Sequence, residues 1–455
     1  MFDFSRDIYK ELLAWKKDKN NKVLEVNGAR QVGKTYILKK FAQENFTQFI
    51  YINMAERTGK KFLKCMEIAE RWEIGEKGSE KPLYDALKLY NVDFVDDENT
   101  LIMIDEIQES SLVYNTIRTF AREFKSYVVV TGSYLGRTYE KGFFLPAGDI
   151  YKITLNTLSF EEFLDIFDKR TMLKELDFFG ESDHKYYDEI REYYELYLQI
   201  GGYPAVIKRY LETKNIEAIF PEIGNIIQIF IQESQMYLGD VRDINIFEQL
   251  LPAIAQTMIK EKKGHSDLVT ELSSIMYKEE SNRVTKKSIN QAIAWLYRSN
   301  VIGYCGKANE CNILDTSLNV RFYFQDVGVA RYFLSIAGAD LATIRGILAE
   351  TFVYRYLQEL CNSYKIAGIS PLFGVYKEGE IDFFVNNRAN YKNFGIEVKA
   401  GSTSGKTAEL LLRDKKVDGI YMLKGDTYGG IHDKMYTIPI YLISQLQFDG
   451  EFQRK

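Results

Sequence analysis

The sequence contains few of the residues that build metal clusters, disulfide scaffolds or membrane spans. Among 455 residues there are 4 cysteines, 3 histidines and 7 prolines. The cysteines form no CxxC pair and the histidines are far apart, so no zinc site is predicted, and the thiols are expected to be buried or inert. The sequence contains no window of about eighteen uninterrupted apolar residues, and the first residues lack a basic start followed by an apolar run. We therefore expect a cytoplasmic protein without a membrane segment.

Length and charge indicate a multidomain protein with a folded core. A chain of 455 residues is too long for one compact core, and 46% hydrophobic residues are ordinary for a globular protein. The formal net charge of -5 argues against a wholly basic coat for nucleic acid. Any contact with a polyanion must therefore come from local basic patches.

A glycine-rich pattern follows the first predicted strand, in the segment KVLEVNGARQVGKTYILKKFAQENF (22–46). A short strand, the spacing Gly28-x4-Gly33-Lys34-Thr35 and an amphipathic helix predict a loop that binds the phosphates of ATP. Lys34 is expected to reach the terminal phosphates, and Thr35 to ligate Mg²⁺. The predicted nucleotide-binding residues are Gly28, Ala29, Arg30, Gln31, Val32, Gly33, Lys34 and Thr35.

Two acidic residues end a second apolar strand in NTLIMIDEIQES (99–110). Asp105 stands where a carboxylate on the metal side of the nucleotide is expected, and Glu106 can polarise the attacking water. The alternative is a strand that simply ends in solvated acids. Adjacent acids favour hydrolysis of ATP over phosphate transfer to a small molecule.

The next strand, in YVVVTGSYLGR (127–137), has Ser133 at its exit. In a doubly wound sheet this strand lies beside the strand of Asp105, so Ser133 is predicted to sense the γ-phosphate. The alternative is that Ser133 is a turn residue. Arg137 is a candidate for a phosphate contact within the same chain.

The middle of the chain is predicted to be helical and then to form a small DNA reader. Apolar residues recur at helical spacing from 159 to 240, which predicts a helical lid. The GGYP segment (201–204) is either a hinge of this lid or an ordinary turn. From 241 to 335, helices followed by a strand pair have the order of a winged helix-turn-helix. Basic residues from Lys278 to Lys307 could face DNA phosphates, although winged helices also serve as plain packing modules.

A second group of charged residues lies near the C-terminus, in GEIDFF (379–384) and IEVKAG (396–401). Glu397 and Lys399 point to one face because they are two apart in a strand, and Asp382 lies on the preceding strand. Glu350 can join them from a helix. Two carboxylates, Asp382 and Glu397, can hold Mg²⁺ for attack of water on a phosphodiester, with Lys399 orienting that water or stabilising charge.

These motifs resemble an AAA-type ATPase family of bacteria and archaea that has a C-terminal restriction-endonuclease-like domain. The resemblance rests on GARQVGKT, DEIQ and TGS, and further landmarks follow in order: LSFEEF, GGYPAVI, FYFQDVGVARYFL and GEIDFF with IEVKAG. It implies an α/β protein with a doubly wound parallel-sheet P-loop core (1–158), a helical lid (159–240), a winged helix-like domain (241–335) and a restriction-endonuclease-like domain (340–455). One departure is Asp149, where the family usually has an arginine.

The sequence therefore predicts an ATP-binding and ATP-hydrolysing switch, with ATP and Mg²⁺ as ligands and DNA as a candidate partner through 278–307 and the C-terminal domain. Two alternatives stay open. The nuclease-like domain could be a non-catalytic binding module of an ATP-dependent regulatory protein, or the P-loop could belong to a small-molecule kinase. An oligomer is compatible with either.

Overall fold

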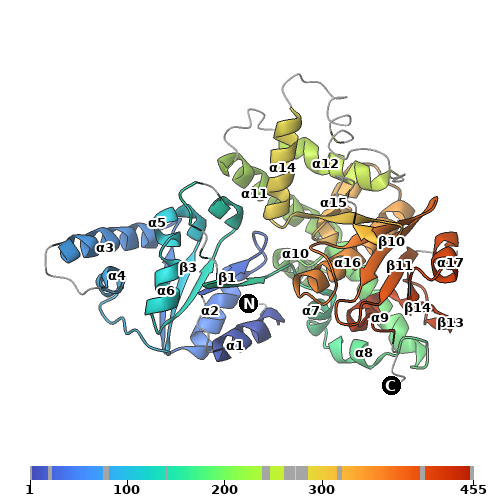
Figure 1. Ribbon diagram of the computed structural model, residues 1–455, viewed down its shortest axis with the longest axis horizontal. Coiled ribbons are helices and arrows are strands. Elements are labelled where there is room, and N and C mark those ends of the chain that lie inside the picture. Colours follow the sequence, from blue (N-terminus) through green and yellow to red (C-terminus); the bar gives the residue numbers. More distant parts are fainter. Residues whose placement is uncertain are drawn as a thin grey trace. The chain divides into compact units, whose positions relative to one another are not determined.

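The computed structural model of the chain describes most of its residues. The described ranges are 3–18, 23–74, 81–139, 141–144, 146, 148–237, 246–260, 272, 285–314, 320–399 and 405–450. The chain divides into two compact units, Arg6–Asn156 and Thr157–Lys455 together with Met1–Ser5 (Figure 1).

The unit Arg6–Asn156 is built on a five-stranded sheet in which every strand pair is parallel. The order across the sheet is β2-β3-β4-β1-β5. The strands are β1 (Val23–Asn27), β2 (Gln48–Asn53), β3 (Thr100–Asp105), β4 (Tyr127–Thr131) and β5 (Ile150–Thr154). Because all strands run in one direction, their carboxyl ends meet at the same edge of the sheet, as the doubly wound fold requires.

Helices connect these strands, since a parallel pair needs a crossover. The connecting helices are α2 (Lys34–Asn45), α3 (Arg57–Ile74), α4 (Pro82–Tyr90), α5 (Ser111–Tyr114) and α6 (Ile117–Glu123), with 3₁₀ turns η1 (Ile107–Glu109) and η2 (Leu135–Tyr139). A further helix, α1 (Ile8–Lys17), precedes β1. α3 and α4 pack against each other (Figure 1). The interior strand β3 lies between β2 and β4 and is buried over its whole length. Its Ile102 and Ile104 join a core with Phe62 and Ile117. The expected order of strand, loop, helix and acid-ended strand is therefore confirmed.

The second unit begins with helices, as the spacing of apolar residues predicted. The helices of the whole unit are α7 (Phe160–Asp165), α8 (Arg170–Glu175), α9 (His184–Ile200), α10 (Pro204–Thr213), η3 (Glu217–Ile219), α11 (Phe220–Tyr237), α12 (Ile246–Ile259), α14 (Lys286–Arg298), α15 (Val327–Ile336), α16 (Leu341–Asn362), α17 (Lys406–Arg413) and η4 (Ile440–Gln445). Thr285 caps α14 by accepting a hydrogen bond from the Ser288 N–H.

The GGYP segment is held closely by its surroundings. Gly202 donates its N–H to Asp326 Oδ2 at 2.8 Å, while Asp326 Oδ1 accepts the N–H groups of Gly328 and Val329 and so caps α15. A Cβ on Gly201, whose φ is +76°, would lie 2.3 Å from the same carboxylate. This packing favours the ordinary turn over the hinge.

A mixed sheet completes this unit, with nine strands among the described residues. Its order is β13-β14-β12-β11-β10-β9-β6-β7, and β8 pairs with β6 off this path. The strands are β6 (Ile302–Asn309), β7 (Ile313–Leu314), β8 (Arg321–Phe324), β9 (Leu372–Tyr376), β10 (Gly379–Asn386), β11 (Asn393–Lys399), β12 (Gly419–Lys424), β13 (Gly430–His432) and β14 (Met435–Pro439). β6 pairs with β9 in parallel, so strands expected in the winged helix and strands expected in the nuclease-like domain share one sheet. The predicted four-domain boundaries stay a prediction.

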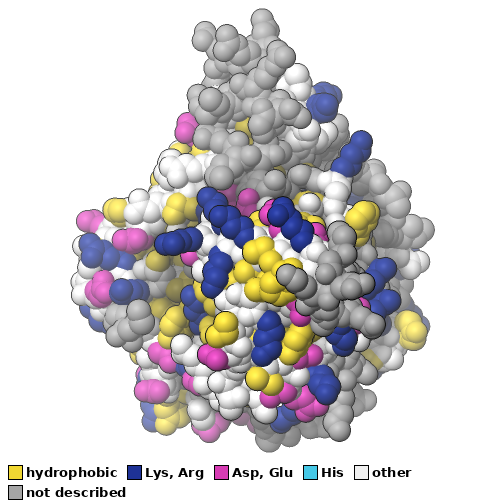
Figure 2. Space-filling model, turned by 90° about the vertical axis from the view of Figure 1, so that its left-hand side faces the viewer, with side chains coloured by type: hydrophobic (Ala, Val, Ile, Leu, Met, Phe, Trp, Pro, Cys, Tyr) yellow, Lys and Arg dark blue, Asp and Glu magenta, His cyan; other side chains and the backbone are white. Residues whose placement is uncertain are grey.

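Surface charge is mixed on the face that Figure 2 shows. Lys and Arg side chains are interspersed there with Asp and Glu, around an apolar group near the middle of the view. This distribution agrees with a net charge of -5. Among the described residues, no helix is both long and apolar enough to cross a membrane.

Candidate functional site

The phosphate loop connects β1 to α2 at the carboxyl edge of the parallel sheet. Gly28 and Gly33 have φ angles of +142° and +97°, which residues that carry a Cβ rarely adopt. A Cβ on Gly28 would also lie 2.1 Å from the Leu155 carbonyl oxygen. The backbone can therefore close into a tight loop at the start of α2, and the start of a helix favours an anion.

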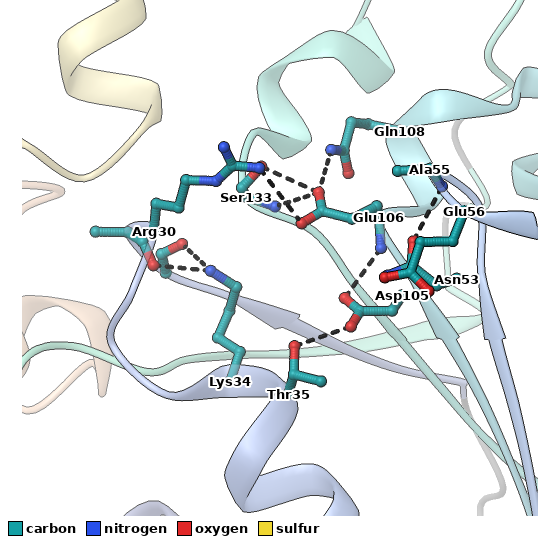
Figure 3. Close-up of polar contacts among 12 residues, drawn as sticks. Arg30, Lys34, Thr35, Asn53, Ala55, Glu56, Asp105, Glu106, Gln108 and Ser133 are labelled. Atoms are coloured by element: carbon teal, nitrogen blue, oxygen red, sulfur yellow. Dashed lines mark hydrogen bonds and ion pairs between the residues drawn. The ribbon is translucent and has the colours of Figure 1, made fainter. Parts of the chain in front are cut away.

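Lys34 is the first residue of α2 and is 8% exposed. Its Nζ donates to the carbonyl oxygens of Gly28 at 2.7 Å and Ala29 at 2.8 Å (Figure 3). These two contacts hold the ammonium over the loop. A cation at this place can bind the terminal phosphates of a nucleotide.

Asp105 ends β3 and lies against the first turn of α2. Its Oδ2 accepts hydrogen bonds from Thr35 Oγ1 at 2.8 Å and from the Tyr51 hydroxyl at 3.0 Å, and its Oδ1 accepts the Glu106 N–H at 3.0 Å. Burial raises the pKa of Asp105 and the nearby Glu106 charge adds to this, while the hydrogen bonds from Thr35 and Tyr51 act in the opposite direction. The structure thus brings together the two predicted metal-side residues, Thr35 and Asp105.

Glu106 stands at the same edge with a left-handed backbone, φ +52°. Its Oε2 accepts hydrogen bonds from Gln108 Nε2 at 2.6 Å, from the Ser133 N–H at 3.2 Å and from Ser133 Oγ at 3.0 Å. The Arg30 guanidinium lies 4.0 Å from its other oxygen (Figure 3). Glu106, Ser133 and Arg30 of the loop therefore converge, although they are far apart in the sequence. Arg137 lies on η2, and its phosphate contact stays a prediction.

The donor set at this edge fits Mg²⁺. One hydroxyl oxygen and one carboxylate oxygen, from Thr35 and Asp105, are hard ligands of the kind Mg²⁺ uses when it keeps several waters and binds nucleotide phosphates. Within the ranges that the structure describes, no group of three or more His, Cys, Asp or Glu side chains is arranged to hold a metal ion.

Arg6 supports the phosphate loop from the start of the chain, which the sequence analysis missed. Its guanidinium donates to the Val32 carbonyl at 2.8 Å and to the Asn156 carbonyl at 2.6 Å, and the side chain is 8% exposed. No motif marks this residue, because its partners are backbone atoms that only the fold brings near.

Asp149 lies at the other edge of the sheet. It directly precedes β5, and Val23 at the amino end of β1 pairs with Ile150, whereas the phosphate loop follows the carboxyl end of β1. Its carboxylate binds Arg118 at 3.3 Å and Arg122 at 3.1 Å. Residue 149 therefore belongs to an ion-pair cluster with α6 and takes no part in this phosphate loop.

The C-terminal charged residues gather on β10, β11 and α16 in the second unit. Asp382 Oδ2 accepts the Val398 N–H at 2.7 Å, and Lys399 Nζ lies 2.8 Å from Glu397 Oε1. Burial raises the pKa of Asp382, and the charges of Glu350 and Glu397 raise it further. The predicted residues Asp382, Glu397, Lys399 and Glu350 therefore lie within electrostatic reach of one another.

Lys399 remains a cation in this cluster. Burial acts to lower its pKa, but the hydrogen bond to Glu397 and the nearby carboxylates raise it above the ordinary lysine value. From β8, the Tyr323 hydroxyl donates to Glu350 at 3.2 Å, a contact that the sequence did not indicate. The two carboxylates Asp382 and Glu397 are oxygen donors of the type that suits Mg²⁺.

Comparison with protein families assigns the first unit to a class. Residues 20–164 match the family described as AAA domain. This match covers the phosphate loop, the acid-ended strand and the Ser133 strand, so the segment is similar to P-loop ATPase domains of AAA type. Residues 191–340 match a family described as a domain of unknown function. No curated protein matches the chain.

Several solved structures match the chain at low sequence identity. The Walker-type ATPase PABY2304 of Pyrococcus abyssi is 14% identical, with a TM-score of 0.45, and the match covers 73% of this chain and 96% of that one. The Orc1 protein of Aeropyrum pernix in complex with DNA is 15% identical, with a TM-score of 0.31 and coverage of 78% and 94%. The RuvB Holliday junction branch migration motor of Thermotoga maritima is 12% identical, with a TM-score of 0.30 and coverage of 66% and 89%.

Proposed function

We propose that this chain is an ATP- and Mg²⁺-dependent switch protein, in which ATP hydrolysis by the AAA-type domain controls the C-terminal part. The observation that carries the proposal is the convergence of Thr35, Asp105, Glu106 and Ser133 around the phosphate loop. The spacing of four residues between Gly28 and Gly33 would be an unspecific pattern by itself. A metal-side acid, a second acid and a hydroxyl at the same sheet edge are the parts that hydrolysis of a nucleotide needs.

In this proposal each residue has one task. The loop amides and Lys34 bind the phosphates, Thr35 and Asp105 hold Mg²⁺, Glu106 orients and polarises the attacking water, and Ser133 reports the γ-phosphate. Bound Mg²⁺ would neutralise charge on the terminal phosphates. Because Ser133 and Glu106 are hydrogen-bonded to each other, a change at the γ-phosphate can reach both residues together.

Two substitutions test the ATP site. Lys34→Ala should abolish nucleotide binding, because the cation that binds the terminal phosphates is removed. Glu106→Gln should still bind ATP but hydrolyse it at least about 100-fold more slowly than the wild type, since a positioned general base contributes a factor of this order to the rate. Release of free phosphate and affinity for ATP are the two measurements.

Glu109→Gln is the matched control, because Glu109 is exposed three residues further along the same segment. It should hydrolyse ATP at the wild-type rate. Normal turnover by Glu106→Gln would sink the assignment of the water-activating residue. Transfer of phosphate to an acceptor in place of free phosphate release would favour the small-molecule kinase.

We further propose four parts for the chain: an ATPase core (1–158), a helical lid (159–240), a winged helix-like domain (241–335) and a restriction-endonuclease-like domain (340–455). The last assignment is supported by the gathering of Asp382, Glu397 and Lys399 on neighbouring strands. In it the two carboxylates would hold Mg²⁺, and Lys399 would orient water or stabilise charge on a phosphodiester. The alternative is a binding module without catalysis.

DNA is the partner proposed for the second unit. Lys286, Lys287 and Arg298 are exposed at the two ends of α14, and Lys307 follows on β6. Cations on one helix and the adjoining strand can contact successive phosphates of a duplex. Lys278 and Arg283, which belong to the same predicted patch, lie outside the described residues.

A further inference from the structure

Tyr51 binds Asp105 but belongs to none of the motifs that define the nucleotide site. It lies on β2, two residues before the strand ends, and Asn53 of the same strand pairs with Asp105 across the sheet. The Tyr51 hydroxyl donates to Asp105 Oδ2 at 3.0 Å. This is the same carboxylate oxygen that accepts the Thr35 hydroxyl at 2.8 Å.

The remaining contacts of Tyr51 fix the position of its ring. Lys39 Nζ of α2 lies 3.8 Å from the ring centroid, and Asn53 Nδ2 donates to the Tyr51 hydroxyl at 3.3 Å. The backbone carbonyl of Tyr51 accepts a hydrogen bond from the Tyr90 hydroxyl at 2.9 Å. The phenol is therefore held from α2 and from its own strand, while the Tyr90 contact reaches only the backbone of β2. The hydroxyl of Tyr51 thus has a defined direction.

These contacts decide how the Asp105 carboxylate is oriented. Its two oxygens offer about four acceptor positions, and Tyr51, Thr35 and the Glu106 N–H take three of them. A carboxylate fixed in this way cannot rotate without breaking several hydrogen bonds. Partners of a metal-side ligand generally set its orientation and hence the affinity for the metal.

We propose that Tyr51 is a positioning residue of the ATP site, which holds Asp105 in the orientation that Mg²⁺ bound to a nucleotide requires. This inference rests on the proposed ATP-dependent function. Tyr51 itself contacts neither phosphate nor metal in this assignment and acts through Asp105.

The test measures how Mg²⁺ changes nucleotide affinity in the full-length protein. The probe is the non-hydrolysable imido analogue of ATP, titrated in EDTA and at a series of Mg²⁺ concentrations. Tyr51→Phe keeps the ring and its contact with Lys39 but removes the donor to Asp105. Mg²⁺ is expected to increase the affinity for the analogue, and Tyr51→Phe should raise the Mg²⁺ concentration at which half of this increase is reached by roughly tenfold. A loss of this size in metal affinity is typical when the hydrogen-bond partner of a metal ligand is removed. The affinity for the analogue in EDTA should be unchanged.

Tyr90→Phe is the matched control, because it removes one phenol hydroxyl from a hydrogen bond to β2 without touching Asp105. The affinity of Tyr90→Phe for the analogue should depend on Mg²⁺ in the same way as that of the wild type. In an Asp105→Asn background Tyr51→Phe should add nothing, since the carboxylate through which it acts is gone. Thermal unfolding of each variant checks that the fold is kept.

A wild-type Mg²⁺ dependence in Tyr51→Phe would overturn the inference while leaving the proposed function intact. If Tyr51→Phe weakened binding of the analogue equally with and without Mg²⁺, this would also overturn the inference, because that result indicates only a structural role. A wild-type protein that binds no nucleotide would instead refute the proposed function, and the role of Tyr51 would fall with it.

Discussion

Carboxylates in this protein differ in what surrounds them, and this difference sets the direction in which their pKa values shift. Asp382 has two carboxylates nearby, and its pKa is raised. Burial also raises the pKa of Asp105, although hydrogen bonds from two hydroxyl groups act to lower it. Asp177 has the opposite balance, because several N–H and O–H groups donate to it. Residue type alone therefore says little about the charge that each group carries.

Asp177 gives a prediction about acid stability. Burial acts to raise its pKa, but hydrogen bonds from the Tyr187 hydroxyl at 2.7 Å, the Phe179 N–H at 2.6 Å and the Ser182 N–H at 2.6 Å lower it below the ordinary value of 3.8. A lowered folded-state pKa stabilises the fold above the unfolded-state pKa, and this contribution is lost as the pH falls through the folded-state pKa. Asp177→Asn should therefore destabilise by about 1–2 kcal/mol near neutral pH.

The measurement is thermal unfolding of the full chain between pH 7 and about pH 3. The difference in unfolding temperature between the wild type and Asp177→Asn should become smaller as the pH falls. Glu181→Gln, an exposed residue of the same loop, should follow the wild type throughout. A difference that stays constant over this range would show that ionisation of Asp177 does not stabilise the fold.

At the scale of elements, local patterns predicted most helices and strands, and failures arose where an apolar run had two readings. The apolar run YTIPIYLI (436–443) has the composition of a single strand, but the strand β14 ends at Pro439 and η4 begins at Ile440. The same residues are buried in either form, since Ile440, Tyr441 and Leu442 all belong to the core. Periodicity cannot separate a buried strand from a buried turn of helix.

The capping box of α7 provides a prediction at this scale. Ser159 Oγ accepts the Glu162 N–H at 3.1 Å, and Glu162 Oε2 accepts the Ser159 N–H at 3.0 Å. Ser159→Ala removes the acceptor and should destabilise the unit by about 1 kcal/mol. Urea unfolding measured by far-ultraviolet circular dichroism would detect this loss.

Ser159→Asp is the control, because aspartate also accepts the N–H at the start of a helix and should remain close to the wild type. Equal stability of the alanine and aspartate variants would contradict a capping role for this side chain.

For the whole molecule, the question is whether the two charged sites work together. If the C-terminal part is a nuclease that ATP controls, DNA should stimulate ATP hydrolysis, and the protein should nick DNA in the presence of Mg²⁺. Asp382→Ala and Lys399→Ala should reduce nicking to background, since they remove a metal-side carboxylate and the cation beside Glu397. A panel of single-stranded, double-stranded and branched DNA, assayed with and without ATP, covers the substrate classes.

Glu378→Ala is the control, because Glu378 is exposed in the turn between β9 and β10. Nicking that persists in Asp382→Ala would come from another site or a contaminant. Stimulation of ATP hydrolysis by DNA without any nicking would instead favour the non-catalytic binding module.

The sequence by itself determined the local parts of the ATP site. The spacing of Gly28, Gly33, Lys34 and Thr35 and the acids after an apolar strand follow from short-range rules, because a loop, a strand and a helix are each specified by neighbouring residues. Only the tertiary structure decided that Tyr51 contacts Asp105, that Arg6 contacts the loop at Val32, and that β6 pairs with β9 in one sheet. Their partners are backbone groups or side chains distant in the chain, and such pairings depend on strand order and register, which no local pattern encodes.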